Sequence, residues 1–115
     1  MGPRAIIAGA GIGGLSTALA LSQEGLAVTI YERAESLEEF GAGIQLTPNA
    51  TRVLARLGVL DEVRAIATRP SAARAVRGAD DVELFRIPLD DAEHRWGAPY
   101  LAIHRADLQL SLIHI

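Results

Sequence analysis

The sequence has no cysteine and few aromatic residues among its 115 residues. Without cysteine, the chain has no disulfide framework, no thiolate metal site and no cysteine nucleophile. Its histidines, His94, His104 and His114, lie ten residues apart without the carboxylate spacing of a metal site, so we expect no bound metal. An excess of positive charge is also missing, because the net charge is −3. We therefore do not expect nucleic acid or an anionic membrane as a partner.

The sequence also lacks an uninterrupted apolar run long enough to span a membrane. Residues 5–21 follow Arg4 and are mostly apolar, which is superficially typical of a secretion signal. Glycines interrupt this run in an order that fits a nucleotide-binding turn better. Because half of the residues are apolar, the chain can form a packed core. We expect a soluble, cytoplasmic α/β protein that is one small domain or a piece of a larger one.

Residues 4–32 have the pattern of a nucleotide-binding unit: strand, glycine turn, helix, strand and a final carboxylate. The first strand is a short apolar run suited to a strand covered on both faces. Gly9, Gly11 and Gly14 then give the G-x-G-x-x-G spacing. Gly9 permits the tight turn, Gly11 lets backbone approach a diphosphate, and Gly14 lets the helix lie close to the strand. The diphosphate would bind the free N–H groups at the helix N-terminus.

The same unit continues with a helix over residues 12–24 and a second strand over residues 26–31. Glu32 follows this strand, where a carboxylate can accept hydrogen bonds from the ribose hydroxyls of a dinucleotide. Arg33 either reaches the adenine or a phosphate, or is an ordinary surface arginine. A glycine-rich turn without a ligand is the simpler alternative, but strand, helix, strand and acid all occur in the expected order.

Beyond this unit, the sequence predicts a connection, a strand and two helices. Ser36 and Glu39 have the spacing of a capping box. Residues 41–46 are strand-like, and Thr47 caps a helix that Gly58 ends. Another short helix is expected after it, ending before Pro70.

A β-hairpin is predicted at about residues 71–90, with strands over 73–77 and 82–87. A polar loop follows, and its Trp96 either faces a ligand or, as we prefer, anchors the loop on the core. Residues 100–103 then read as a strand, and a last helix is expected to begin at His104.

Three motifs occur in order: GAGIGG with Glu32-Arg33, then GAGIQLTPNATRVLARLG, then IHRADLQ. Together they resemble the N-terminal part of FAD-dependent aromatic-ring hydroxylases, the single-component flavoprotein monooxygenases similar to salicylate and 3-hydroxybenzoate hydroxylases. The first motif is shared by many dinucleotide binders, and the other two are more particular. The resemblance covers residues 4 to about 110, and it implies a Rossmann-like βαβ FAD-binding fold with an added β-hairpin.

The resemblance also implies which residues hold the cofactor. The glycines would cradle the FAD diphosphate, the acid would hold the adenosine ribose, and the glutamine would approach the flavin side. The arginine of the third motif would contact FAD, although it could instead be a first-turn helix residue paired with an acid. The cofactor-binding residues implied in this way are Gly9, Gly11, Gly14, Glu32, Arg33, Gln45 and Arg105.

The implied activity is hydroxylation of a phenolic ring with FAD, with O₂ and with NADH or NADPH as co-substrate. Members of this family are several hundred residues long, and their second FAD-contacting region and most of the substrate pocket lie further downstream. We therefore expect residues 1–110 to be the N-terminal part of an FAD-binding domain, without identifiable catalytic residues. Residues 111–115 do not continue the amphipathic pattern and are expected to be a non-native tail. The alternatives are the nucleotide-binding unit of an NAD-dependent dehydrogenase and an inert, truncated nucleotide-binding module.

Overall fold

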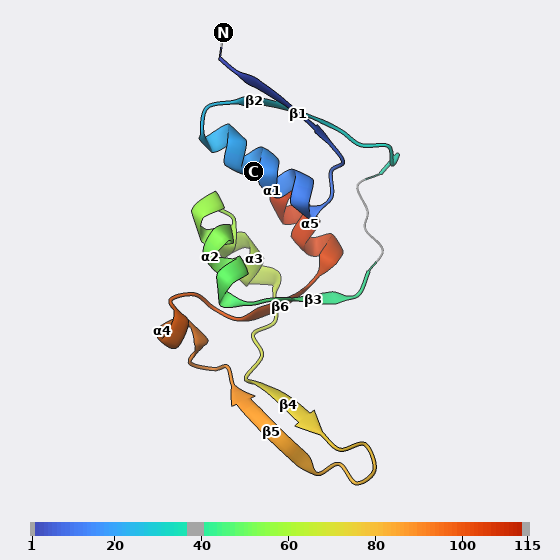
Figure 1. Ribbon diagram of the computed structural model, residues 1–115, viewed down its shortest axis with the longest axis vertical. Helices are drawn as coiled ribbons and strands as arrows, with labels where there is room; N and C mark the ends of the chain where they lie inside the picture. Colours follow the sequence, from blue (N-terminus) through green and yellow to red (C-terminus); the bar gives the residue numbers. More distant parts are fainter. Residues whose placement is uncertain (1, 37–40, 114–115) are drawn as a thin grey trace.

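The chain is elongated, with extents of 62, 33 and 20 Å, and has a βαβ unit at one end and a β-hairpin at the other (Figure 1). The computed structural model describes residues 2–36 and 41–113. Its elements are β1 (Arg4–Ala8), α1 (Ile12–Gln23), β2 (Ala27–Tyr31), β3 (Gly43–Leu46), α2 (Pro48–Leu57), α3 (Leu60–Ile66), β4 (Ala72–Val76), β5 (Glu83–Pro88), α4 (Ala92–Trp96), β6 (Leu101–His104) and α5 (Arg105–Ile113). The predicted α/β class, with a βαβ unit and an added hairpin, is confirmed.

Strands β1 and β2 form a parallel pair, with α1 as the crossover between them. Along both strands, half-buried residues alternate with exposed ones. Ile6, for example, is 75% exposed. The sequence predicted a first strand covered on both faces, and this is wrong for the described residues. Helix α1 covers one face, and no second layer of described residues covers the other.

The core lies between α1, the helices α2, α3 and α5, and the antiparallel pair of β3 and β6 (Figure 1). Val59 and Val63, around the start of α3, are fully buried. Leu101 from β6 and Leu108 from α5 pack in the same cluster, and Leu15 joins it from α1. Helix α5 therefore connects the βαβ unit to the helical layer.

Helix α2 begins and ends where the sequence predicted. Thr47 is its N-cap residue, and Gly58 ends it with a left-handed backbone, at φ 81°. The Thr47 hydroxyl bonds the side chain of Asn49 rather than capping a helix N–H group. Glu39 of the predicted capping box lies outside the described residues.

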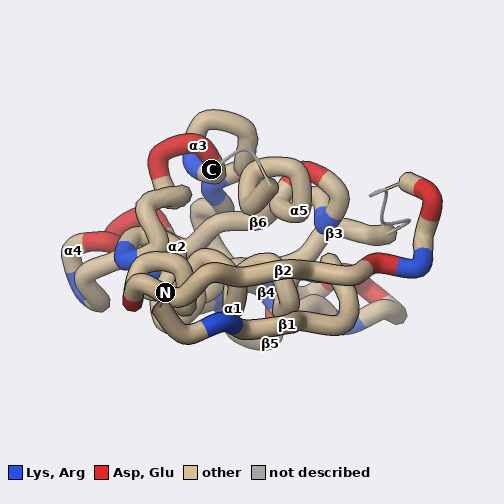
Figure 2. The backbone as a smooth tube through the Cα atoms, turned by 90° about the horizontal axis from the view of Figure 1, so that it is seen from above, with Lys and Arg blue, Asp and Glu red and all other residues tan. Residues whose placement is uncertain are grey.

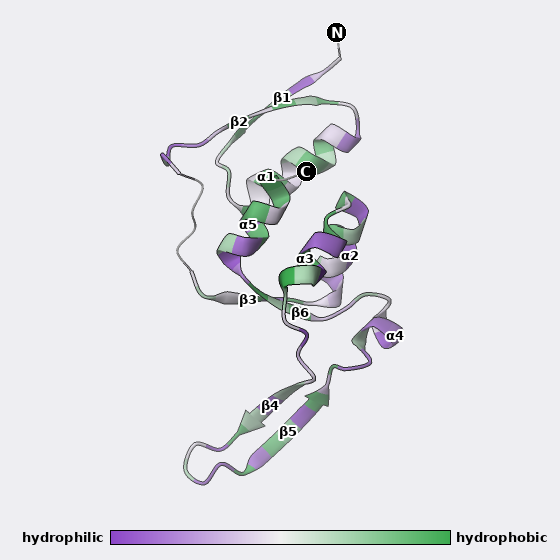
Figure 3. Cartoon of the chain, turned by 180° about the vertical axis from the view of Figure 1, so that it is seen from behind, coloured by the Kyte–Doolittle hydropathy of each residue, from purple (hydrophilic) through white to green (hydrophobic). Residues whose placement is uncertain are grey.

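Strands β4 and β5 form the predicted antiparallel hairpin, with a bulge between Ala75 and Val76. Polar and apolar residues are mixed along it (Figure 3). The predicted alternation of polar and apolar residues would bury one face of β5, but neither face is buried, because every residue of β5 is exposed. Phe85, for example, is 58% exposed. The hairpin projects from the body (Figure 1), and Leu84 of β5 is as exposed as Phe85, at 59%.

The segment predicted as a polar loop contains the short helix α4. Trp96 at its end is 38% exposed, so the expectation that it anchors on the core is wrong. The Arg95 guanidinium lies 4.5 Å from the centre of its ring. The buried residues around α4 are Leu89, Ala92, Ala98 and Pro99.

Helix α5 begins at Arg105, one residue later than predicted, and continues past Leu110 to Ile113. Leu112 is 2% exposed and belongs to the core. The change of pattern predicted after Leu110 therefore does not end the helix. That residues 111–115 are non-native stays a prediction.

Candidate cofactor-binding site

The glycine turn between β1 and α1 requires glycine at two of its positions, for two different reasons. Gly9 has a φ of 105°, a conformation that side chains rarely allow. A Cβ on Gly14 would lie 2.1 Å from the carbonyl oxygen of Gly9. Gly14 therefore lets α1 begin directly against the end of β1. The sequence predicted these two structural roles, a tight turn at Gly9 and close packing of helix on strand at Gly14.

Gly11 is the N-cap residue of α1 and has an extended backbone, with φ −73° and ψ −177°. The first N–H groups of α1 follow it and have no intrahelical acceptors. Together with the helix dipole, they form the kind of anion-binding position expected for a diphosphate. The structure thus brings Gly9, Gly11 and Gly14 together at one end of β1.

Glu32 lies directly after β2 and beside this turn. Its Oε2 accepts a hydrogen bond of 2.7 Å from the Ala10 N–H, and its Oε1 accepts one of 3.2 Å from the Ala34 N–H. These backbone donors, Ala10 first, lower the pKa of Glu32 below its usual value. Glu32 is therefore ionised at neutral pH. Each carboxylate oxygen keeps a lone pair for another donor, such as a ribose hydroxyl.

Arg33 is exposed and directly follows Glu32, so opposite charges adjoin beyond the end of β2 (Figure 2). Its charge and its N–H both help to lower the pKa of Glu32. Arg33 thus lies beside Glu32, and its contact with the cofactor stays a prediction.

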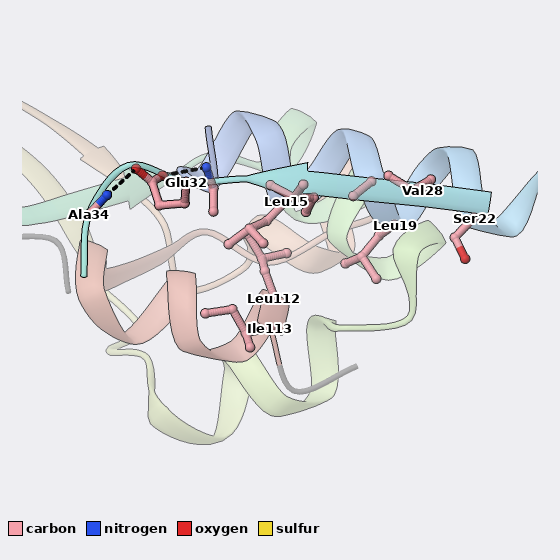
Figure 4. A pocket seen from close by; sticks show the side chains of 11 residues that line it. Leu15, Leu19, Ser22, Val28, Glu32, Ala34, Leu112 and Ile113 are labelled. Carbon is pink, nitrogen blue, oxygen red and sulfur yellow. Dashed lines mark hydrogen bonds between the residues drawn. The ribbon is translucent and has the colours of Figure 1, made fainter. Parts of the chain in front are cut away.

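A cavity of about 490 Å³ borders the turn between α1, β2 and the end of α5. Leu15 and Leu19 of α1, Val28 of β2 and Leu112 of α5 line it, and Glu32 is at one end (Figure 4). Its lining is mostly apolar, and within the described part of the chain Glu32 is the only charged side chain there. The cavity therefore adjoins the predicted cofactor-binding residues only at the end where Glu32 lies.

The other two predicted residues lie at a separate corner formed by β3, β6 and α5. Gln45 is on β3, and its Oε1 accepts a hydrogen bond of 2.8 Å from the Tyr100 hydroxyl. Arg105 is the first residue of α5, and its backbone N–H lies 3.4 Å from the Ala42 carbonyl oxygen. Gly41 lies beside the Arg105 side chain, since a Cβ on Gly41 would be in ordinary contact with it at 3.6 Å.

Two polar residues at buried contacts were missed in the sequence. Gln109 on α5 donates from Nε2 to the Ala10 carbonyl oxygen at 2.9 Å, and Thr51 on α2 donates to the Pro99 carbonyl oxygen at 2.7 Å. Their partners are 99 and 48 residues away in sequence, so no local pattern could identify them. The only available signal was a polar residue at an apolar position of a helix.

The residues present fit the dinucleotide that the sequence led us to expect. Gly9 has a positive φ that side chains disfavour, a side chain on Gly14 would clash with the Gly9 carbonyl oxygen, and a charged acceptor lies beside the helix N-terminus. In the described part of the chain, no group of three histidine or acidic side chains could hold a metal ion.

Comparison with known proteins agrees with this geometry. The family model described as an FAD binding domain matches residues 4–111. A 3-amino-4-hydroxybenzoate 2-monooxygenase of Streptomyces platensis is 41% identical over 98% of this chain and 29% of its own length. A 3-hydroxybenzoate 6-hydroxylase of Polaromonas naphthalenivorans is 41% identical over 94% of this chain and 27% of its own.

Solved structures show the same relationship. A 2-methyl-3-hydroxypyridine-5-carboxylic acid oxygenase superimposes with a TM-score of 0.84 and 32% identity, over 97% of this chain and 28% of its own. Klebsiella pneumoniae HpxO, in complex with FAD and uric acid, superimposes with a TM-score of 0.82 and 29% identity, over 97% and 28% of the two chains. The chain thus spans about 29% of the length of the relatives it matches. With nearly its whole length matched, it belongs to the FAD binding domain family.

Proposed function

We propose that this chain is the N-terminal part of an NAD(P)H-dependent flavoprotein monooxygenase that hydroxylates a phenolic or aromatic acid. Its own share of the work is to hold the ADP half of FAD. The observation that carries this proposal is the Glu32 carboxylate, bonded at 2.7 Å to the N–H of Ala10 within the glycine turn. This bond supports the proposal, because it holds a carboxylate beside the N-terminus of α1, where a diphosphate would bind and a ribose would need an acceptor.

Each site residue then has a role toward the cofactor. Gly9, Gly11 and Gly14 bring backbone close to the diphosphate, and Glu32 accepts the ribose hydroxyls. Arg33 adds positive charge beside that carboxylate. Gln45, at the other corner, would approach the flavin side of the cofactor, and Arg105 would contact FAD.

The bound FAD would supply the redox chemistry that couples NADH or NADPH oxidation and O₂ to hydroxylation of the aromatic ring. This chain contributes binding and orientation, and its described residues provide no side chain to which we assign catalysis. The substrate class follows from the relatives, whose names describe enzymes acting on hydroxybenzoates and related ring acids.

The proposal includes a small aromatic substrate and O₂ as partners, with neither nucleic acid nor a membrane among them. Within the described residues, no helix has the length and apolar character needed to cross a bilayer. The cytoplasmic location expected from the sequence remains a prediction.

An NAD-dependent dehydrogenase would use the same residues 4–32 for its own cofactor. The match to an FAD binding domain over residues 4–111 and the likeness to a protein solved with FAD favour the flavoprotein. A third possibility concerns the 115 residues alone, which would form an inert nucleotide-binding module if the flavin end of the site lies downstream.

The ribose role of Glu32 is tested by FAD titration of the proposed full-length protein carrying Glu32→Ala. A hydrogen bond to a charged group contributes about 1.5–3 kcal/mol, so we expect FAD to bind about 10- to 100-fold more weakly. Glu35→Ala is the matched control, because Glu35 is an exposed acid of the same connection. It should leave the dissociation constant unchanged. Equal FAD affinity in the Glu32 variant and the parent would remove this role.

A further inference from the structure

Gln109 is a buried polar residue on α5 whose amide reaches the glycine turn. Its side chain is only 3% exposed, and its Nε2 donates to the Ala10 carbonyl oxygen at 2.9 Å. The neighbouring positions of α5, Leu108 and Leu112, are part of the apolar core. An amide in such surroundings must be hydrogen-bonded to be tolerated.

The Ala10 peptide is thereby held from two sides. Its N–H donates to Glu32 Oε2 at 2.7 Å, and its carbonyl accepts from Gln109. Ala10 lies between Gly9 and Gly11, the residues with the greatest backbone freedom in the turn. Two fixed hydrogen bonds at the residue between them restrict that freedom.

The orientation of the Gln109 amide is determined by this contact. Exchanging its nitrogen and oxygen would bring two oxygens together at Ala10, so Nε2 must face the carbonyl. Oε1 is then buried without a hydrogen-bond partner among the described residues. An apolar side chain of the same length would avoid that cost, so packing alone does not favour glutamine at this position.

Arg105 lies one helical turn before Gln109 on α5. Residues four apart lie on the same face of a helix. The bond from Gln109 to Ala10 therefore also fixes the face of α5 that carries Arg105 relative to the glycine turn. One residue connects the two separate corners of the site.

We propose that Gln109 is a positioning residue for the cofactor, which holds the Ala10 peptide so that the glycine turn and α5 keep one fixed arrangement. This inference rests on the proposed FAD site. It concerns the turn itself, so part of it can be measured without FAD.

The test compares Gln109→Met in the proposed full-length protein with the parent. Methionine keeps the length of the side chain and removes the donor. Loss of one such hydrogen bond should raise the FAD dissociation constant about three- to tenfold. In the ligand-free protein, the backbone amides of residues 9–14 should exchange with deuterium faster than in the parent.

Gln23→Met is the matched control. Gln23 Nε2 also donates to a backbone carbonyl, that of Leu57, at 2.9 Å, but from the far end of α1. The control should leave both the FAD affinity and the exchange of residues 9–14 as in the parent. If Gln109 had only a structural role, both variants would have a lower thermal midpoint, but they would not differ in FAD affinity or in the exchange of residues 9–14.

Unchanged exchange and unchanged FAD affinity in the Gln109 variant would overturn the proposal, and the proposed function would stand if Glu32→Ala still weakened FAD binding. If the parent bound no FAD, faster exchange of the turn would still support Gln109 as its positioning residue.

If the variant did not fold, ¹⁵N NMR of the unaltered protein would decide. Slow exchange of the Gln109 side-chain amide supports the bond, and exchange as fast as in a solvent-exposed glutamine contradicts it.

Discussion

Gly13 and Gly14 are neighbours in sequence, but their surroundings at the start of α1 are different. A Cβ on Gly13 would meet no atom within 4 Å, whereas one on Gly14 would lie 2.1 Å from the Gly9 carbonyl oxygen. The cofactor-binding pattern thus requires one of these glycines for packing and not the other. The sequence motif G-x-G-x-x-G makes the same distinction, since Gly13 is not one of its fixed positions.

We predict that alanine has opposite effects at these two positions. Gly14→Ala should lower the free energy of unfolding by about 1–3 kcal/mol, because α1 must move away from β1. Gly13→Ala should raise it by about 0.4–1 kcal/mol, because alanine restricts the unfolded chain and favours the helix. Urea unfolding of the ligand-free protein measures both. A Gly14 variant as stable as the parent would contradict the close contact.

At the residue scale, the sequence indicates the glycines and Glu32 because all of them belong to one strand–helix–strand unit. Strand, turn and helix follow one another, so the spacing alone fixes their geometry. The role of Gln109 could not be predicted in this way, because its bond to Ala10 depends on how α5 packs against α1. That packing is a tertiary property without a local signature.

At the element scale, α2 is joined to the chain before β6 by a single buried hydrogen bond. Thr51 is fully buried, and its hydroxyl donates to the Pro99 carbonyl oxygen at 2.7 Å. Pro99 is itself buried. Without Thr51, this carbonyl would lose its donor away from water.

Thr51→Val should therefore lower the free energy of unfolding by about 1–3 kcal/mol, since valine has the same shape but no hydroxyl. Thr17→Val is the control, because Thr17 is an exposed helical threonine that bonds the Gly13 carbonyl of its own helix. That change should stay within about 0.5 kcal/mol of the parent. Equal stability of the two variants in urea unfolding would mean that the Pro99 contact contributes nothing.

Helices with end signals were predicted well at this scale. Helix α2 has the predicted bounds because its end signals are local: Pro48 is its first residue, and Gly58 ends it with a left-handed backbone. Helix α4 was missed because it is only one short turn inside a polar stretch. The burial of Trp96 was also predicted wrongly, for a related reason. Which side chain reaches the core depends on the path of the loop, and its composition does not determine this.

At the scale of the whole molecule, two of the surfaces that expose apolar side chains lie at opposite ends of the described structure (Figure 1). One is the outer face of the βαβ unit, with Ile6 and Tyr31, and the other is the hairpin, with Leu84 and Phe85. The chain spans about 29% of the length of its relatives. We therefore expect the activity to need the rest of the proposed protein, including the walls of the flavin end of the site.

One measurement on the purified full-length protein tests whether it is an NAD(P)H-dependent flavoprotein monooxygenase. Its absorption spectrum is recorded before and after addition of NADH or NADPH, and O₂ consumption is then followed with a hydroxybenzoate present. We predict a yellow protein whose flavin bands are bleached by the nicotinamide and which consumes O₂ with the aromatic acid. The 115-residue chain alone should consume none. A colourless full-length protein whose fluorescence changes only with NADH would contradict the proposed flavoprotein function.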